Sequence, residues 1–296
     1  MYISIRDDML VQAGFTNVAE GAKRIGVNAI EVELDQDFMV YCLDSTDSTL
    51  RADLETDEGV ALYKKHLEAL GVTACAFLTA RDFSMGDLES NTRWVARALE
   101  IAEQMGMASI RIDSAMKRER ELDFTTRVDL FAKGLGGALE RTAGMKVAMG
   151  IENHGFQGNN LAFLLNVFRI VGSDRLGSTM DTGNFYWRGY PLSEVYGILQ
   201  LLAPYTKHTH LKNIRYPKDK RETIREAGWE YGAYVCPLYD GDIDHGRVLQ
   251  ILADAGYSGN ICIENESLGK CANDEERQSV LKREVEHLRE KLATLG

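Results

Sequence analysis

The sequence predicts an α/β fold: a single (β/α)8 TIM barrel, in which a parallel eight-stranded barrel is surrounded by outer helices. Strand-like and helix-like patterns alternate along the whole chain. The strand-like runs are short and almost continuously apolar, as expected for strands buried on both faces. The length of 296 residues accommodates a barrel of about 250 residues with extensions. No linker or low-complexity tract interrupts the pattern, so we expect one domain over residues 1–296.

Eight segments carry the strand pattern. They are Tyr2–Ile5, Ala29–Leu34, Val72–Leu78, Ser109–Ile112, Val147–Ile151, Gly177–Met180, His208–Leu211 and Asn260–Ile263. Eight strands in a chain of this length favour a closed barrel over a doubly wound sheet. No GxGxxG motif follows the first strand, which removes the main sequence signal for a dinucleotide-binding fold.

Seven longer segments have apolar residues at helical spacing. Gly71 and Gly106 are predicted C-terminal caps, Asp244 is a predicted N-cap, and Pro191 suits a helix start. The glycine-rich stretch Lys133–Gly137 indicates either close packing or a break in its helix, and the sequence leaves both open. The predicted helices are Glu58–Leu70, Thr92–Met105, Phe124–Thr142, Asn160–Val171, Pro191–Leu202, Gly246–Ala255 and Asp274–Leu292. Two stretches, Asp35–Asp57 and Asn213–Asp244, are long loops at strand ends, where loops of this length are usually functional.

Composition narrows the class of protein. The chain is 45% hydrophobic and 27% charged, and no run of about 18 apolar residues predicts a membrane span. Its net charge of −11 disfavours a nucleic-acid partner, which needs clustered basic residues. The start of the chain, MYISIRDDML, has no secretory apolar region. No CxxC pair occurs among the five cysteines, and we expect a reducing, cytoplasmic location.

Four polar residues end strand-like runs in the second half of the chain: Glu152, Asp181, His210 and Glu264. They are separated by 29 (181 − 152), 29 (210 − 181) and 54 (264 − 210) residues. A strand–helix unit takes about 30 residues, so these residues fall on successive strand ends. Taken singly, each of these residues is readily explained as an ordinary polar residue at the end of a strand. Together, in a ring of parallel strands, they predict a metal site at the mouth of the barrel.

The ligand types indicate a hard cation. Three carboxylates and one imidazole suit Mn²⁺, Mg²⁺ or Co²⁺ better than a thiolate-rich site would. Zn²⁺ also accepts these ligands. We therefore expect one divalent metal ion, with Mn²⁺ first among the candidates.

The segments IENHG, MDTGNF, HTHLKN and YSGNICIENE resemble signatures of the xylose isomerase-like barrel superfamily, which includes the sugar phosphate isomerase/epimerase family. Its members include D-tagatose 3-epimerase-type enzymes, inosose dehydratases and type-IV AP endonucleases. The resemblance is strongest from Val147 to Ser267. It implies that Glu152, Asp181, His210 and Glu264 bind one metal ion. It further implies a carbohydrate substrate and a homo-oligomer.

The same resemblance implies a reaction. In the ketose epimerases, the residues matching Glu152 and Glu264 are also the acid/base pair that moves a proton next to a carbonyl. A metal ion that bridges a carbonyl and a hydroxyl oxygen stabilises the enediolate by Lewis acidity. Isomerase or epimerase is therefore the first interpretation. A lyase or dehydratase acting on a keto-polyol or a 3-keto-sugar shares the first step and remains the alternative.

Two further classes are less favoured. Cleavage of abasic DNA conflicts with the net charge. It also conflicts with Asn184, which stands three residues after Asp181, where several relatives carry His. A barrel that only binds a carbohydrate or a partner conflicts with the complete set of four ligands, which a non-catalytic chain would be freer to lose.

Five residues are candidate substrate contacts. His154, two residues after Glu152, would bind substrate or close a loop. Arg111, at the end of its strand with Asp113, would grip sugar hydroxyls or join a salt-bridge network. Trp187 would form an aromatic wall with Trp229, Tyr231 and Tyr239, or a packed loop core. Asn184 and Arg215 complete the set of candidates: His154, Asn184, Arg215, Arg111 and Trp187.

Basic residues cluster just after the seventh strand. Residues 212–225 contain six basic and two acidic side chains, a local charge of 6 − 2 = +4 in a chain of −11. A solvated loop explains this by default, and steering of an anionic substrate is the alternative. Arg215 is the best placed for steering, five residues after His210, where a basic residue of the ketose epimerases contacts substrate. His208 shares a strand face with His210 and is expected to be buried behind it.

Overall fold

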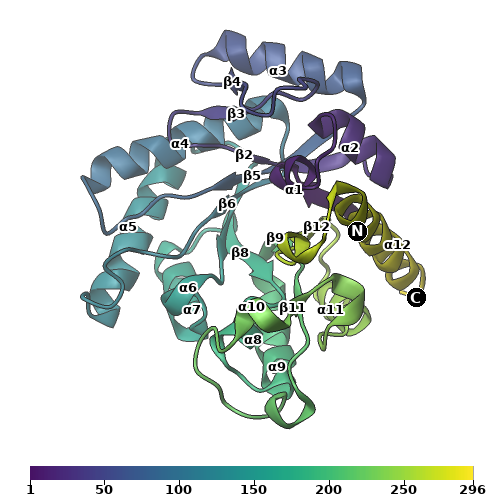
Figure 1. Ribbon diagram of the computed structural model, residues 1–296. Helices are drawn as coiled ribbons and strands as arrows, with labels where there is room; N and C mark the ends of the chain where they lie inside the picture. Colours follow the sequence, from purple (N-terminus) through teal and green to yellow (C-terminus); the bar gives the residue numbers. More distant parts are fainter. Residues whose placement is uncertain (296) are drawn as a thin grey trace.

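The computed structural model describes residues 1–295 and forms the predicted barrel (Figure 1). Eight strands pair in parallel in the order β12-β1-β2-β5-β6-β7-β8-β9. The ring closes where Leu211, just after β9, pairs in parallel with Ile263 of β12. These strands are β1 Tyr2–Arg6, β2 Ala29–Glu33, β5 Thr73–Thr79, β6 Ser109–Ile112, β7 Ala148–Glu152, β8 Leu176–Asp181, β9 Thr206–His210 and β12 Asn260–Ile263. All eight predicted strands are confirmed, with ends shifted by one or two residues at several of them.

The α-helices surround this ring (Figure 1). Among residues 1–295 they are α1 Asp7–Gln12, α2 Val18–Ile25, α3 Asp57–Leu70, α4 Leu88–Met105, α5 Phe124–Arg141, α6 Gly155–Gly158, α7 Leu161–Val171, α8 Asn184–Arg188, α9 Leu192–Leu202, α10 Tyr231–Tyr234, α11 His245–Asp254 and α12 Asp274–Ala293. Short 3-10 turns are η1 Ala203–Tyr205, η2 Lys218–Lys220, η3 Leu238–Asp240 and η4 Leu268–Lys270. None of the helices in this part of the chain is both long and apolar enough to cross a membrane.

All seven predicted helices form, with small shifts at their ends. Gly71 and Gly106 end α3 and α4 in the left-handed conformation, and Asp244 caps α11 by accepting from the Gly246 N–H. Pro191 precedes α9 instead of starting it, because its ψ of 145° is extended. Helices α1 and α2, between β1 and β2, were not predicted, and they are only 6 and 8 residues long. Helices this short show too little periodicity to stand out in the sequence.

The glycine-rich stretch of α5 reflects close packing, because the helix continues through it without a break. A Cβ on Gly134 would lie 2.4 Å from Cε1 of Phe83, far inside van der Waals contact. Phe83 itself packs edge-on against Phe131 of the same helix, with ring centroids 5.0 Å apart. Glycine therefore lets the loop after β5 sit directly on α5.

The two predicted long loops carry small hairpins at the carboxyl end of the barrel strands. After β2, strands β3 (Met39–Tyr41) and β4 (Arg51–Asp53) pair antiparallel. After β9, strands β10 (Asn213–Ile214) and β11 (Val235–Cys236) do the same. Both hairpins follow strand ends, and loops at that end of a barrel form its mouth.

Strand β2 shows how the barrel separates apolar from polar side chains. Ile30 and Val32 are fully buried in the main hydrophobic core. Glu31, between them, is also fully buried but contacts two histidines of β9 instead. Because successive side chains of a strand point to opposite faces, the helix-facing layer is apolar while the barrel interior holds charged groups.

Candidate metal centre

The structure brings the four predicted ligands together. Glu152, Asp181 and His210 are the last residues of β7, β8 and β9, and Glu264 directly follows β12. Each offers one ligand atom, and these atoms all lie within 4.8 Å of one another. Nδ1 of His210 is 3.4 Å from Glu152 and 3.7 Å from Glu264. All four residues are at most 4% exposed.

Two ligand atoms of this group make no hydrogen bond, although a charged group lies 3.4 Å from each of them. Oδ1 of Asp181 accepts from the backbone N–H groups of Gly183 and Asn184, at 2.8 and 2.6 Å, whereas its Oδ2 has no hydrogen-bond partner. Nδ1 of His210 is likewise buried without a hydrogen bond. Buried polar atoms nearly always make hydrogen bonds, so these two atoms and the carboxylate–imidazole set together suit a divalent metal ion.

Two arginines from other strands form ion pairs with the carboxylates of Glu152 and Glu264. Nε of Arg111, in β6, donates to Glu152 at 2.5 Å, and Arg6, at the end of β1, forms an ion pair with Glu264. Burial alone would raise the pKa of Glu152, but Arg111 and His210 hold it well below its ordinary value. Burial also opposes ionisation of Glu264, yet Lys212, His210 and Arg6 lower its pKa well below the usual range. Both carboxylates are therefore ionised at neutral pH.

Lys212 lies among the four residues, although from the sequence it was predicted only as part of a basic loop. Its buried Nζ lies 2.9 Å from Glu264 and 3.4 Å from Asp181, and it also pairs with Glu266. Burial raises the pKa of Asp181, and the ammonium group of Lys212 only partly opposes this. The spacing from His210 was the signal available in the sequence, because alternate residues of an extended segment share a face.

A second buried group lies beneath the first. Nε2 of His210 is 2.8 Å from Oε2 of Glu31, and Nε2 of His208 is 2.8 Å from Oε1 of the same carboxylate. Burial opposes the charge of Glu31, but the two imidazoles lower its pKa below the ordinary value. The expectation that His208 is buried beside His210 is confirmed. Glu31 was missed, because site residues were sought at strand ends and Glu31 lies in the middle of β2.

Three of the predicted substrate contacts lie beside Glu152. Arg111 binds it directly, Asn184 Nδ2 donates to its Oε1 at 3.1 Å, and His154 follows it by two residues. Nδ1 of His154 is 2.9 Å from Asp113 at the mouth, and the histidine side chain is 43% exposed. Burial tends to lower the pKa of His154, but Asp113 outweighs it and raises the value to about 9. Contact of these residues with substrate stays a prediction.

The other two predicted contacts lie in the loop region after β9. Arg215 is 60% exposed and 3.8 Å from Asp240, and it lines a separate cavity with Cys236 and Tyr239. Trp187 packs against the loop at Gly228, whose N–H donates to its carbonyl at 2.8 Å. No described contact joins Arg215 or Trp187 to the four ligands within residues 1–295, so their roles remain predictions.

Much of the positive charge in this loop is already used within the fold. Arg221 pairs with Asp242 at 2.9 Å. Arg225 is 8% exposed and lies over the rings of Tyr186 and Tyr216. Trp229 stacks on Tyr234, with ring centroids 5.6 Å apart. These contacts form a packed loop core, one of the two interpretations of the aromatic residues.

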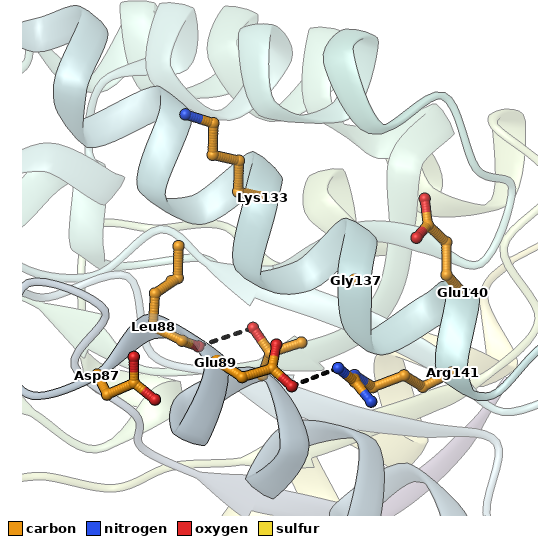
Figure 2. Close-up of a pocket in the computed structure, with 8 residues that line it drawn as sticks. Asp87, Leu88, Glu89, Lys133, Gly137, Glu140 and Arg141 are labelled. Carbon is orange, nitrogen blue, oxygen red and sulfur yellow. Dashed lines mark hydrogen bonds and ion pairs between the residues drawn. The ribbon is translucent and has the colours of Figure 1, made fainter.

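A cavity of about 350 Å³ opens at the mouth, lined by Arg6, Glu33, Leu34, Asp35, Gln36, Leu78, Thr79, Ala80 and Arg111. Its lining therefore includes the two arginines that form ion pairs with Glu152 and Glu264. A different cavity, of about 640 Å³, lies between the start of α4 and α5 (Figure 2). Glu89 and Arg141 form an ion pair across it, and none of the four ligands lines it. None of the four ligands lines the mouth cavity either, and its link to them runs through Arg6 and Arg111.

Curated relatives match parts of the chain. It is 33% identical to an inosose dehydratase of Clostridium perfringens over 99 residues, which is 31% of this chain and 31% of that protein. It is 27% identical to an inosose dehydratase of Klebsiella pneumoniae over 143 residues, or 46% of each chain. The matches thus span less than half the length of these relatives.

Solved structures match nearly the whole chain at low identity. A D-psicose 3-epimerase with D-tagatose, from Clostridium cellulolyticum H10, has a TM-score of 0.71 at 11% identity and covers 99% of both chains. An L-ribulose 3-epimerase gives 0.70 at 15% identity, with 99% of this chain and 95% of the other covered. The IOLI protein with a bound zinc atom gives 0.69 at 15% identity, covering 98% and 99%. At these identities the likeness concerns the fold alone.

The family model described as "Xylose isomerase-like TIM barrel" matches residues 19–291. That span contains seven of the eight barrel strands and all four of the clustered ligands. The closed parallel barrel and this match lead to one conclusion: the chain belongs to the xylose isomerase-like TIM barrel family.

Proposed function

We propose that this protein is a divalent-metal-dependent isomerase or epimerase of a sugar or sugar derivative, acting by proton abstraction next to a carbonyl. The observation that carries the proposal is the placement of Glu152 and Glu264. Both are buried and ionised, and they approach His210 from β7 on one side and β12 on the other. Two carboxylates so placed can remove a proton from one face of a substrate and return it elsewhere.

The residues of the site take distinct roles in this proposal. Glu152, Asp181, His210 and Glu264 hold the metal ion, with Mn²⁺ as the first candidate. A bound divalent ion would supply Lewis acidity that offsets the negative charge developing on the substrate oxygens. Glu152 and Glu264 exchange the proton.

The residues around the ligands orient them and exclude water. Arg111 helps to keep Glu152 ionised, and Lys212 and Arg6 do the same for Glu264, each through an ion pair. Burial of the ligand group keeps bulk water from the reacting carbon. His154, Asn184 and Arg111 contact the carbohydrate at the Glu152 side of the mouth.

A lyase or dehydratase acting on a keto-polyol or 3-keto-sugar is the second candidate, and the His154–Asp113 pair favours it. Proton abstraction is the same, but a leaving oxygen must then be protonated. Nδ1 of His154 is committed to Asp113, and the ring is partly exposed at the mouth, two residues from the proposed base. Its Nε2 is thus the nitrogen free to donate to a leaving group. The partial similarity to inosose dehydratases supports the same candidate.

Proton exchange in D₂O tests both candidates. The metal-loaded protein is incubated with free ketoses, keto-polyols and 3-keto-glycosides, and the products are followed by NMR. Deuterium at the carbon next to the carbonyl, together with a rearranged sugar, is the result expected of an isomerase or epimerase. Deuterium together with loss of water or of an aglycone identifies the lyase. Tight metal binding without exchange on any of these substrates contradicts both.

A further inference from the structure

We propose that Glu31 is a positioning residue that sets the orientation and tautomer of His210, so that Nδ1 of this histidine faces the metal site. The inference rests on the proposed metal-dependent function and extends it below the four ligands. Glu31 lies in β2, and the two histidines it contacts lie in β9, so the interaction crosses the interior of the barrel.

The contacts between Glu31 and the histidines define the geometry. Nε2 of His210 is 3.0 Å from Oε1 and 2.8 Å from Oε2 of Glu31. Nδ1 of the same ring faces Glu152 and Glu264 and has no hydrogen bond. The imidazole thus has one nitrogen tied to a buried carboxylate and the other directed at the ligand cluster.

The chemistry of a carboxylate decides which nitrogen carries the proton. An ionised carboxylate only accepts hydrogen bonds, so Nε2 of His210 must donate. A neutral ring that donates from Nε2 has its lone pair on Nδ1, which is the form that binds a metal ion. Carboxylates placed behind metal-binding histidines in this way raise ligand basicity and restrict ring rotation.

His208 keeps Glu31 itself in place. Its Nε2 is 2.8 Å from Oε1, so the carboxylate bridges two imidazoles from one strand. The three side chains are completely buried and come from strands of the ring, which leaves them little freedom to reorient. Glu31 therefore acts on the metal through His210 and does not touch the substrate.

A competing interpretation is a second metal site, because Glu31, His208, His210 and Cys262 also lie within 4.8 Å of one another. The hydrogen bonds argue against it, since Nε2 of both histidines already engages the carboxylate. Cys262 is 3.8 Å from Glu31 Oε2, at the edge of a sulfur hydrogen bond. Metal stoichiometry separates the two interpretations.

The test compares Glu31→Gln with Cys262→Ala as the matched control. Cys262→Ala removes the neighbouring thiol but leaves the carboxylate that accepts from His210. Equilibrium dialysis against Mn²⁺ and Co²⁺ gives the stoichiometry and the Kd, the Co²⁺ absorption spectrum reports ligand geometry, and thermal unfolding of the metal-free proteins reports stability. We expect one equivalent of metal in the wild-type protein. Glu31→Gln should raise Kd by roughly 10- to 100-fold and change the Co²⁺ spectrum, while Cys262→Ala leaves both unchanged.

A wild-type measurement keeps the proposal testable if Glu31→Gln fails to fold. In the Zn²⁺-loaded protein, ¹⁵N NMR should show His210 protonated on Nε2 and coordinated through Nδ1. The reverse tautomer would overturn the inference.

The remaining outcomes are distinguishable. Equal Kd values for the wild type and Glu31→Gln overturn the positioning role and leave the metal-dependent function standing. Two equivalents of metal, one of them lost in Cys262→Ala, replace it with a second metal site. No binding of metal by the wild-type protein sinks the proposed function together with this inference.

Discussion

At the scale of single residues, charge pairing decides what the site can do. Glu152 and Glu264 are buried, and a buried carboxylate without a partner would be protonated. Arg111 and His210 prevent this at Glu152, and Lys212, His210 and Arg6 prevent it at Glu264. Each arginine also has a second acidic partner, Asp113 for Arg111 and Asp8 for Arg6, so neutralising one glutamate leaves neither guanidinium unpaired.

Replacing Glu152 or Glu264 by Gln should abolish turnover while the fold is kept. The amide preserves size but neither binds the metal as an anion nor accepts the substrate proton, and we expect a loss of about 10²-fold or more in kcat. Steady-state kinetics and circular dichroism check this. Glu89→Gln, which breaks an exposed pair on the outer face of α4, is the matched control and should retain full activity. Near-normal kcat in either site variant would remove the acid/base assignment.

Arg215 offers a test of substrate charge. If it steers an anionic substrate, Arg215→Ala should raise KM for a sugar phosphate and leave KM for a neutral ketose unchanged, because electrostatic attraction acts only on the charged molecule. The effect should weaken as salt is added. Lys218→Ala, a charge removal in the same loop, serves as the comparison. Equal KM changes for charged and neutral substrates would argue against steering.

At the scale of elements, α5 shows how packing selects small residues within a helix. Glycine is unfavourable in a helix interior by roughly 1 kcal/mol relative to alanine. Gly134 and Gly136 both carry this cost, but only Gly134 lies under an aromatic ring. The same substitution at the two positions should therefore have opposite effects.

Gly134→Ala should lower the free energy of unfolding by about 1–3 kcal/mol, because its Cβ would overlap Phe83. Gly136→Ala should raise it by up to about 1 kcal/mol, since its Cβ would meet nothing closer than Val171 Cγ2 at 3.9 Å. Urea unfolding of the two variants and the wild type measures both. Equal stabilities of the two variants would contradict the close approach of Phe83.

At the scale of the whole molecule, stability depends on a buried acid in the C-terminal helix. Glu284 in α12 is fully buried and accepts from Leu238 N at 2.9 Å and from Asn265 Nδ2 at 2.7 Å, and no ion pair joins it to a cation among residues 1–295. Burial raises its pKa from 4.5 to about 8. The folded protein therefore keeps a proton that the unfolded chain has released between these pH values.

This difference gives a pH dependence with a definite sign. The contribution of Glu284 to stability is fully present below about pH 4.5 and is lost as the pH rises toward about 8. Glu284→Gln mimics the protonated acid and cannot ionise. Its free energy of unfolding should therefore exceed that of the wild type at pH 8 by more than at pH 5. Urea titrations at both pH values measure this. An equal difference in free energy of unfolding between the two proteins at pH 5 and at pH 8 would show that Glu284 does not titrate between these pH values.

Local patterns in the sequence determined the fold and the four proposed ligands. Alternating apolar strands and amphipathic helices are visible within short windows, and a ring of parallel strands must bring residues at equivalent strand ends together. Glu152, Asp181, His210 and Glu264 could be named for that reason. The bounds of α1 and α2 could not, because short helices show little periodicity.

Tertiary structure alone decided which groups surround those ligands. Arg6 meets Glu264 across 258 residues of sequence, and Glu31 meets His210 across 179. Closure of the ring places β12 beside β1, and side chains of β2 and β9 meet across the barrel interior. No local sequence pattern predicts either contact. Periodicity shows whether a side chain is turned inward, but the charged neighbour that meets it there depends on strand order and register.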